Sequence, residues 1–251
     1  MEIQKPERPF VAPSKKELIL GLIYLPLHMF VIGELLIFGL TLVDIPLTLA
    51  QLNLVYMLLG TLYLMVAMSR YMKASFAPFR AFGISHLWAL PLGWALRIAL
   101  TLPISIALVI FAPELANPNQ DAVEYIVGQS FLASFLLAVI LAPIVEEILF
   151  RGLIFAPLRK KNRFLAYAVS SIAFGFLHIA VSLLWGFTPE LFLVMLLYVP
   201  AGLVLAWVYE KSGNIWTAIL LHGFMNLVSI LLMRLLEALG DFFQYFEYYF
   251  Y

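Results

Sequence analysis

Cysteine is absent from the 251-residue chain, which excludes disulfide bonds, thiolate zinc sites and a cysteine nucleophile. Charge is scarce as well: only 12% of the residues are Asp, Glu, Lys or Arg, against about 25% in an ordinary soluble domain. The 15 basic and 15 acidic side chains cancel, so the chain lacks the basic footprint of a nucleic-acid-binding protein. Hydrophobic residues make up 64% of the chain, which excludes a single water-soluble domain and indicates a polytopic membrane protein.

Long hydrophobic runs predict the membrane spans, since about 20 apolar residues cross a hydrocarbon core of roughly 30 Å. Five runs contain no charged residue, and two more qualify if each tolerates one internal charge, Glu34 in the first and Arg97 in the second. The predicted spans are residues 18–43, 45–69, 81–113, 125–145, 164–185, 191–209 and 212–233. We therefore expect an all-α transmembrane helix bundle of seven spans, with eight as the alternative count.

Basic residues are distributed unevenly over the predicted loops. Twelve of the 15 Lys and Arg residues, Lys5 and Arg8 among them, lie in the N-terminal segment and in the second, fourth and sixth loops. The loops between these contain none. Because cytoplasmic loops carry the excess of Lys and Arg, we predict a cytoplasmic N-terminus and an outside C-terminus. The expected location is the cell membrane, or the endoplasmic reticulum membrane in a eukaryote.

The chain shows no internal repeat, low-complexity stretch or Pro/Gly/Ser linker, so we expect residues 1–251 to form one integral membrane domain. The part that carries the polar motifs described below covers about residues 122–236. The C-terminal segment 241–251 is dense in aromatic residues, which is typical of an interfacial segment at headgroup level. Membrane lipid is therefore an expected partner of the chain.

The fourth predicted span ends in an acidic motif, E-E-I-L-F-R, that begins at Glu146. Ionisable residues inside a bilayer are costly and by default indicate function. Residues four apart share a helix face, so Glu147 and Arg151 are expected to pair along the helix. Glu146 points about 100° away from that pair and stays free.

Two later spans carry histidines at helical spacing. The fifth span contains F-G-F-L-H, with Phe174 one turn from His178, and the seventh contains H-G-F-M-N, with His222 one turn from Asn226. At 1.5 Å per residue from the basic end, Glu146, His178 and His222 lie at depths of about 16, 22 and 16 Å. Three helices therefore place their polar residues at a similar level of the membrane.

These patterns, E-E-x-x-x-R, F-x-x-x-H and H-x-x-x-N in this order, resemble the CPBP (Abi) family of intramembrane proteases. That family includes type II CAAX prenyl endopeptidases and bacteriocin-processing members. The resemblance covers about a third of the chain, residues 146–226. It implies hydrolysis of a peptide bond in a membrane-associated or prenylated peptide or protein.

The resemblance also implies a role for each motif residue. Glu146 would be the general base and would act with His178 to activate a water molecule. His222 and Asn226 would stabilise the oxyanion, as N–H donors do most strongly in a water-poor cavity. The acidic motif's ion pair would support the site.

A catalytic zinc ion is the alternative to a metal-free reaction, because a Glu and two His with an open position can form a zinc shell. Its ligands would be Glu146, His178 and His222. The sequence has no H-E-x-x-H motif that would settle the question, and we favour the reaction without a cofactor.

Two other functions could use the same buried charges: a proton-coupled transporter, or a non-catalytic membrane protein of the bacteriocin-immunity type. The two halves show no matched broken helices, which counts against a transporter. Glu34 and Arg97 are both mid-membrane by the same depth count, and we expect them to pair with each other. The alternatives for these two residues are lining the substrate path or accepting a peptide carboxylate. His28 lies near a span end, where an interfacial histidine is ordinary.

Overall fold

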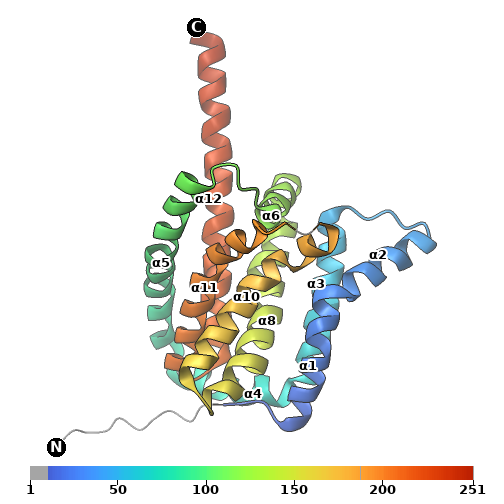
Figure 1. Cartoon of the computed structure of the whole chain (residues 1–251), viewed down its shortest axis with the longest axis vertical. Helices are drawn as coiled ribbons and strands as arrows, with labels where there is room; N and C mark the ends of the chain where they lie inside the picture. Colours follow the sequence, from blue (N-terminus) through green and yellow to red (C-terminus); the bar gives the residue numbers. More distant parts are fainter. Residues whose placement is uncertain (1–10, 187, 251) are drawn as a thin grey trace, which may run out of the picture.

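The computed structural model describes residues 11–186 and 188–250, which are helical apart from short connections and contain no strand (Figure 1). The expected all-α fold is confirmed. Its helices are α1 (Lys15–Phe30), α2 (Ile32–Leu42), α3 (Leu49–Ala67), α4 (Ser69–Phe82), η1 (Gly83–Trp88), α5 (Ala89–Phe111), α6 (Pro118–Gln129), α7 (Phe131–Ser134), η2 (Phe135–Leu141), α8 (Ala142–Glu147), η3 (Ile148–Phe155), α9 (Ala156–Arg159), α10 (Arg163–Trp185), α11 (Leu191–Ser212) and α12 (Ile215–Phe250).

Six helical stretches are long and apolar enough to cross a membrane, and α1 with α2 makes a seventh if this bent pair counts as one span. α1 and α2 meet at an angle of 58° on either side of Val31. The six stretches are Leu49–Ala67, Gly83–Phe111, Phe131–Arg159, Arg163–Leu184, Leu191–Ser212 and Ile215–Gly240. The prediction of about seven spans in a multi-pass membrane protein is therefore confirmed, and the described residues contain no eighth.

The fourth span differs most from its prediction. It was expected to end at Val145, but the helix runs from Phe131 to Arg159, and α7, η2, α8, η3 and α9 form it without a break. The acidic motif therefore lies inside the span. The predicted span ended too early because the hydropathy count treats every charged residue as unfavourable in a span. Glu147 and Arg151 form an ion pair at 3.1 Å, so their charges neutralise each other within the helix.

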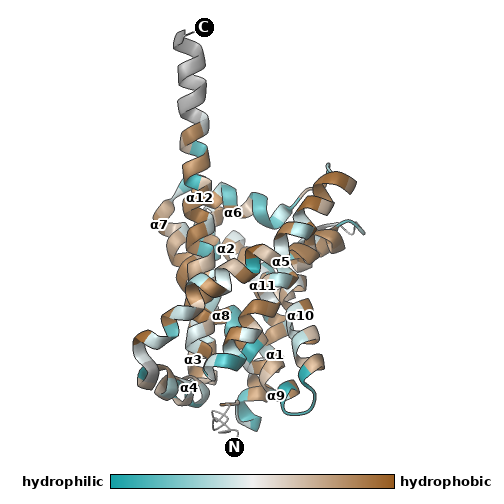
Figure 2. Ribbon diagram, turned by 90° about the vertical axis from the view of Figure 1, so that its left-hand side faces the viewer, coloured by the Kyte–Doolittle hydropathy of each residue, from teal (hydrophilic) through white to brown (hydrophobic). Residues whose placement is uncertain are grey.

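The fourth span lies at the centre of the bundle. α10 and α11 pack against it and against each other, α5 covers α11, and α1 and α3 lie on the other side (Figure 1). Hydrophobic residues cover most of the long helices, whereas hydrophilic residues gather at the two ends of the bundle and along α8 (Figure 2). The central helix thus carries polar groups inside an apolar shell.

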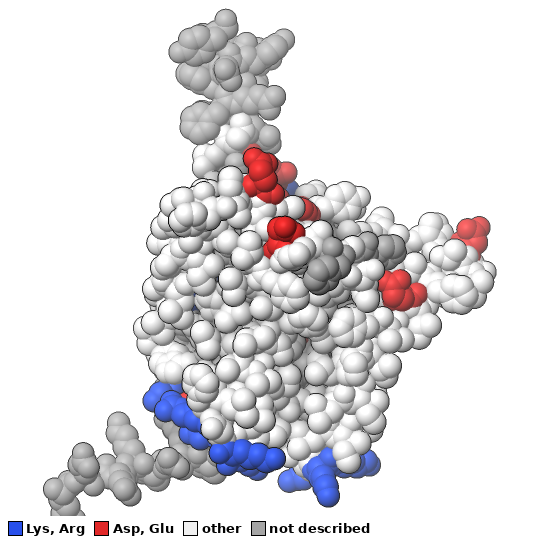
Figure 3. Space-filling model, viewed as in Figure 1, with Lys and Arg blue, Asp and Glu red and all other residues white. Residues whose placement is uncertain are grey.

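The two ends of the bundle carry opposite charge. Lys and Arg side chains gather at the end where α4 lies, and the exposed Asp and Glu side chains gather toward the other end (Figure 3). At the basic end, Glu210 binds both Arg159 and Arg163 and joins α11 to α9 and α10. This separation supports the predicted orientation, although Lys5 and Arg8 lie outside the described residues. The side chains of residues 241–251 also lie outside the description, so the interfacial tail stays a prediction, while the backbone of α12 continues to Phe250.

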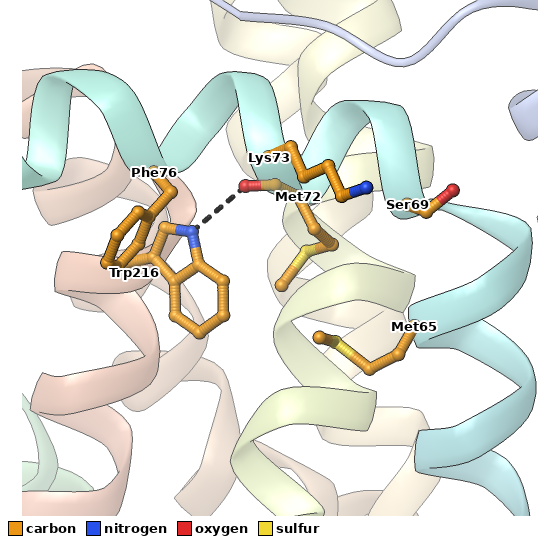
Figure 4. A pocket seen from close by; sticks show the side chains of 6 residues that line it. All are labelled: Met65, Ser69, Met72, Lys73, Phe76 and Trp216. Carbon is orange, nitrogen blue, oxygen red and sulfur yellow. Dashed lines mark hydrogen bonds between the residues drawn. The ribbon is translucent and has the colours of Figure 1, made fainter.

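A contact at the basic end fixes the start of α12. The indole Nε1 of Trp216 donates a hydrogen bond to the carbonyl oxygen of Met72 at 3.1 Å, which ties α12 to α4 (Figure 4). Beside this bond, Met65, Ser69, Met72, Lys73, Phe76 and Trp216 line a mainly apolar cavity of about 290 Å³. His222 follows Trp216 after less than two turns, so the contact also sets the register of the helix that carries His222.

Replacing Gly202 by Ala is expected to destabilise the packing of α10 on α11. An added Cβ would lie 2.9 Å from the Cα of Ser171 and 3.1 Å from its carbonyl oxygen, and backbone atoms cannot move aside. Overpacking of this kind costs about 1–3 kcal/mol. Thermal unfolding in detergent micelles should show a lower midpoint for Gly202→Ala. Gly39→Ala is the control, since an added Cβ there meets no atom within 4 Å; equal midpoints for the two variants would contradict this account.

The absence of cysteine allows the orientation to be measured directly. Lys161 lies between α9 and α10 at the basic end, and Thr188 lies in the connection between α10 and α11 at the other. Both residues are exposed. A membrane-impermeant maleimide added to intact cells should label Thr188→Cys and leave Lys161→Cys unlabelled until the membrane is opened. The reverse pattern would invert the predicted topology.

Candidate active site

The carboxylate of Glu147 is the centre of the polar cluster. Its Oε1 accepts a hydrogen bond from Nδ1 of His222 at 2.9 Å, and its Oε2 lies 3.1 Å from Nε of Arg151. The ion pair expected from the i,i+4 spacing is therefore present. The side chains of Glu147 and Arg151 are 0% exposed. Arg151 also donates from Nη2 to the carbonyl oxygen of Gly202 at 3.0 Å, so Glu147 connects α8 to α12 directly and to α11 through Arg151.

Glu146 faces the other nitrogen of the same imidazole. Its Oε2 lies 3.8 Å from Nε2 of His222, and it is buried without a hydrogen-bond partner among the described residues. This distance is too long for a direct hydrogen bond, but one water molecule can bridge two polar atoms at such a separation. His222 therefore lies between the two neighbouring glutamates of the acidic motif.

The ring of Phe174 packs against both histidines. Its centroid lies 5.5 Å from the ring of His222 and 5.0 Å from that of His178, and the guanidinium carbon of Arg151 lies 4.8 Å from the same centroid. A cation above an aromatic ring is stabilised by the ring quadrupole. Phe174 thus separates the two imidazoles and helps to hold the arginine of the ion pair.

His178 lies one turn from this cluster and does not touch Glu146. Its Nδ1 donates to the carbonyl oxygen of Phe174 at 2.9 Å, because a carbonyl can only accept, and its ring stacks on Tyr198 at 4.0 Å. No hydrogen bond or ion pair joins His178 to Glu146 within the described ranges. The Nε2 atom of His178 is left without a proton when the ring is neutral.

Asn226 also lies beside the cluster. Its Nδ2 donates to the carbonyl oxygen of Ala138 at 2.8 Å, which ties α12 to η2. Gly223 brings these two helices together, since a Cβ at that position would lie 2.5 Å from the carbonyl oxygen of Val139. The structure therefore joins Glu146, Glu147, Arg151 and His222, and it places His178 and Asn226 around them.

The donor set does not fit a metal ion. Among the described residues, no group of three or more His, Cys, Asp and Glu side chains has the arrangement of a metal site. Glu146, His178 and His222, the ligands of the zinc alternative, are therefore not gathered into a shell. We derive no step through a metal.

Helices from the first half of the chain cover the Glu146 side of the cluster. His28 was expected near the interface, but it is only 2% exposed; its Nδ1 lies 3.2 Å from the hydroxyl of Tyr24, and its ring stacks on Tyr56 at 4.7 Å. An added Cβ at Gly60 would lie 3.6 Å from the Cγ2 of Val145, which precedes Glu146 in α8.

The expected pair between Glu34 and Arg97 does not form. No ion pair joins them, and both residues lie within the described part of the chain. Glu34 is exposed on α2, which bends away from the bundle, whereas Arg97 is half-buried on α5 at the opposite side (Figure 1). The depth count places Glu34 and Arg97 at one level of the membrane, but it does not show that their helices lie on opposite sides of the bundle.

Sequence reasoning missed two features of the site. Glu147 was paired only with Arg151, and its second partner, His222, lies 75 residues away on another helix. Tyr198, which stacks on His178, carried no signal, because one tyrosine in an apolar span is ordinary. Both features depend on which helices are neighbours, and hydropathy does not determine that.

Comparison with known proteins agrees with the motifs. Residues 128–228 match the family described as type II CAAX prenyl endopeptidase, Rce1-like. YdiL of Bacillus subtilis (strain 168), provisionally described as a membrane peptidase, is 29% identical over 151 residues, which are 60% of this chain and 57% of that protein. The UPF0177 protein YxdF of Lactococcus lactis subsp. lactis (strain IL1403) is 30% identical over 99 residues, 39% of this chain and 49% of its own. No solved structure matches the chain significantly.

The matched segment contains every residue of the three motifs, from Glu146 to Asn226. Residues 128–228 are therefore similar to the Rce1-like type II CAAX prenyl endopeptidase family, a family of peptidases. The alignments span 57% and 49% of the lengths of the two relatives described above. The similarity thus rests on residues 128–228, the part of the chain that carries the polar cluster.

Replacing Glu147 by Gln is expected to destabilise the fold strongly. The change leaves the Arg151 guanidinium buried without its counter-ion, which costs about 3–5 kcal/mol. The double variant Glu147→Gln/Arg151→Met should recover much of this loss, because it removes the cation too. Denaturant titration in mixed micelles measures the free energy of unfolding. Glu237→Gln is the control, since it breaks an exposed ion pair with Arg234 that is worth at most about 1 kcal/mol. A double variant no more stable than Glu147→Gln would refute this explanation.

Proposed function

We propose that the protein is an intramembrane endopeptidase in which Glu146 activates the hydrolytic water and His222 stabilises the oxyanion. The observation that carries this proposal is the position of His222, with Nδ1 bonded to Glu147 and Nε2 3.8 Å from Glu146. A buried carboxylate without a partner, facing an imidazole that a second carboxylate orients, is an arrangement suited to moving protons. The substrate would be a peptide or protein segment at the membrane, prenylated or otherwise membrane-associated.

The bond to Glu147 fixes the tautomer of His222. A carboxylate can only accept, so Nδ1 carries the hydrogen and the neutral ring has a free lone pair on Nε2. If His222 takes up a second proton, the imidazolium is stabilised by Glu147, much as a buried carboxylate stabilises the histidine of a catalytic triad. Only this form can donate from Nε2 to an oxyanion. The oxyanion role of His222 therefore depends on Glu147.

The reaction can then be written with every proton accounted for, if it starts from the form of His222 that carries a hydrogen on both ring nitrogens. Glu146 removes a proton from the water as its oxygen attacks the carbonyl carbon of the scissile bond. The negative charge that develops on the carbonyl oxygen is met by the Nε2–H of His222. When the C–N bond breaks, Glu146 returns the proton to the leaving amine.

His178 and Asn226 would act from the two sides of this centre. The neutral His178 keeps a free Nε2 that can accept a hydrogen bond from the same water or from the substrate, because its Nδ1 is bonded to the backbone. Asn226 donates one N–H to the carbonyl oxygen of Ala138, which leaves it a single N–H for the oxyanion. We therefore assign the larger part of the stabilisation of the oxyanion to His222.

Replacing Glu146 by Gln is expected to abolish cleavage. The amide keeps the size of the side chain but cannot accept the proton, and loss of a general base lowers the rate by about 10²–10⁴-fold. Purified protein in liposomes would be incubated with a library of membrane-associated peptides, and the products would be identified by mass spectrometry.

Glu34→Gln is the matched control, because Glu34 is also a carboxylate within an expected span but lies exposed on α2. It should cleave like the unmodified protein. Full cleavage by the Glu146→Gln variant would refute the proposal. The proposal would also fail if the unmodified protein gave no cleavage product and instead carried a proton-coupled flux, which would indicate a transporter. If the Glu146→Gln variant still protects cells against a bacteriocin, the protein is a non-catalytic binding protein of the immunity type.

A further inference from the structure

One face of α5 points into the bundle at the level of the polar cluster. Gly93 lies so close to α12 that an added Cβ would come within 2.4 Å of the Cδ2 of Leu221, the residue before His222. Residues four apart on a helix share a face, so Arg97 and then Thr101 follow Gly93 on this inward side. α5 also packs along α11.

Two polar groups on this face lack partners. Arg97 is half-buried and forms no ion pair with any described Asp or Glu. The hydroxyl of Thr101, one turn farther, is buried and has no hydrogen-bond partner in the part of the chain that the structure describes. An unpaired cation within a membrane span is costly and by default indicates a functional site. This stretch of α5 is therefore incomplete without a ligand that accepts hydrogen bonds.

The surroundings of Arg97 connect it to the proposed active site. Arg97 interacts electrostatically with Tyr198 and His178, whose rings stack at 4.0 Å. The hydroxyl of Tyr198 donates to Oδ1 of Asn117 at 3.2 Å and accepts from Nδ2 of Asn119 at 3.0 Å, so its own bonds are satisfied.

No nearby acid neutralises this cation. Asp121 acts electrostatically on Tyr198, but it is exposed at the start of α6 and forms no ion pair with Arg97 in the described ranges. The positive charge beside His178 is thus left for a ligand to neutralise.

We propose that Arg97 and Thr101 form a subsite that binds a carboxylate group of the substrate, next to His178. A guanidinium offers parallel N–H donors that match the two oxygens of a carboxylate, and a threonine hydroxyl can add a third donor. The subsite deepens the proposed endopeptidase function and rests on it. The carboxylate belongs either to the C-terminus of the peptide or to an acidic side chain near the cleaved bond, and the two sources are separated by experiment.

The test measures binding apart from cleavage. One N-acylated hydrophobic tetrapeptide would be prepared with a free C-terminal carboxylate, with a C-terminal amide, and as the amide with one internal Glu. Dissociation constants would be measured in nanodiscs on the Glu146→Gln protein, which cannot turn the peptide over. We expect a carboxylate form to bind about tenfold or more tightly than the plain amide, because hydrogen bonds to a charged group are worth that much. The preferred form identifies the source of the carboxylate.

Substitutions then locate the preference. Arg97→Gln in the same background should bind all three peptides equally, whereas Arg97→Lys should keep part of the preference, since it keeps the charge without the paired geometry. Thr101→Val has nearly the same shape as threonine, should reduce the preference, and serves as the second variant if Arg97→Gln fails to fold. Arg234→Gln is the matched control, because this arginine already has Glu237 as its partner.

Two outcomes would overturn the subsite: equal binding of all three peptides to the Glu146→Gln protein, or a preference that survives in Arg97→Gln. Failure of the proposed function has a different signature. In that case the carboxylate preference and its loss in Arg97→Gln are both observed, yet the unmodified protein cleaves none of the peptides in the library. The two proposals can therefore fail separately.

Discussion

The rest of the site depends on the two contacts that the carboxylate of Glu147 makes. One oxygen neutralises the fully buried guanidinium of Arg151, and the other fixes the tautomer and orientation of His222. Arg151 in turn binds the backbone of Gly202, so this carboxylate connects the central helix to both α11 and α12. A buried charge is tolerated only when it is paired and hydrogen-bonded, and here the pairing also positions the imidazole beside Glu146. The Glu147 carboxylate thus contributes both to the stability of the fold and to the proposed chemistry of the site.

The central helix is wound irregularly on either side of the two glutamates. η2 and η3, on either side of α8, have the wider π-helical turn, which is rare and frequent at functional sites. Glu146 and Glu147 are adjacent in α8, so their side chains leave the helix in different directions, yet both reach His222. Because the imidazole has two nitrogens on different edges, it can lie between the two carboxylates.

The sequence predicts contacts within a helix better than contacts between helices. The Glu147–Arg151 pair follows from the i,i+4 spacing alone, and equal depth predicted that Glu146 and His222 meet, as they do at 3.8 Å. The depth count placed His178 at a similar level as well, but this histidine lies beside the cluster and donates to the carbonyl oxygen of Phe174. Depth fails for Glu34 and Arg97, because it carries no information about which side of the bundle a helix occupies.

The two halves of the chain contribute different things to the site. The groups that would carry out hydrolysis all lie within residues 128–228, the segment that matches the family. The surfaces around them come from earlier helices: α1 and α3 supply the buried His28 and Tyr56, and α5 supplies Arg97. Under the proposed function, the reacting groups therefore lie in the segment that matches the family, and the proposed carboxylate subsite at Arg97 lies before it.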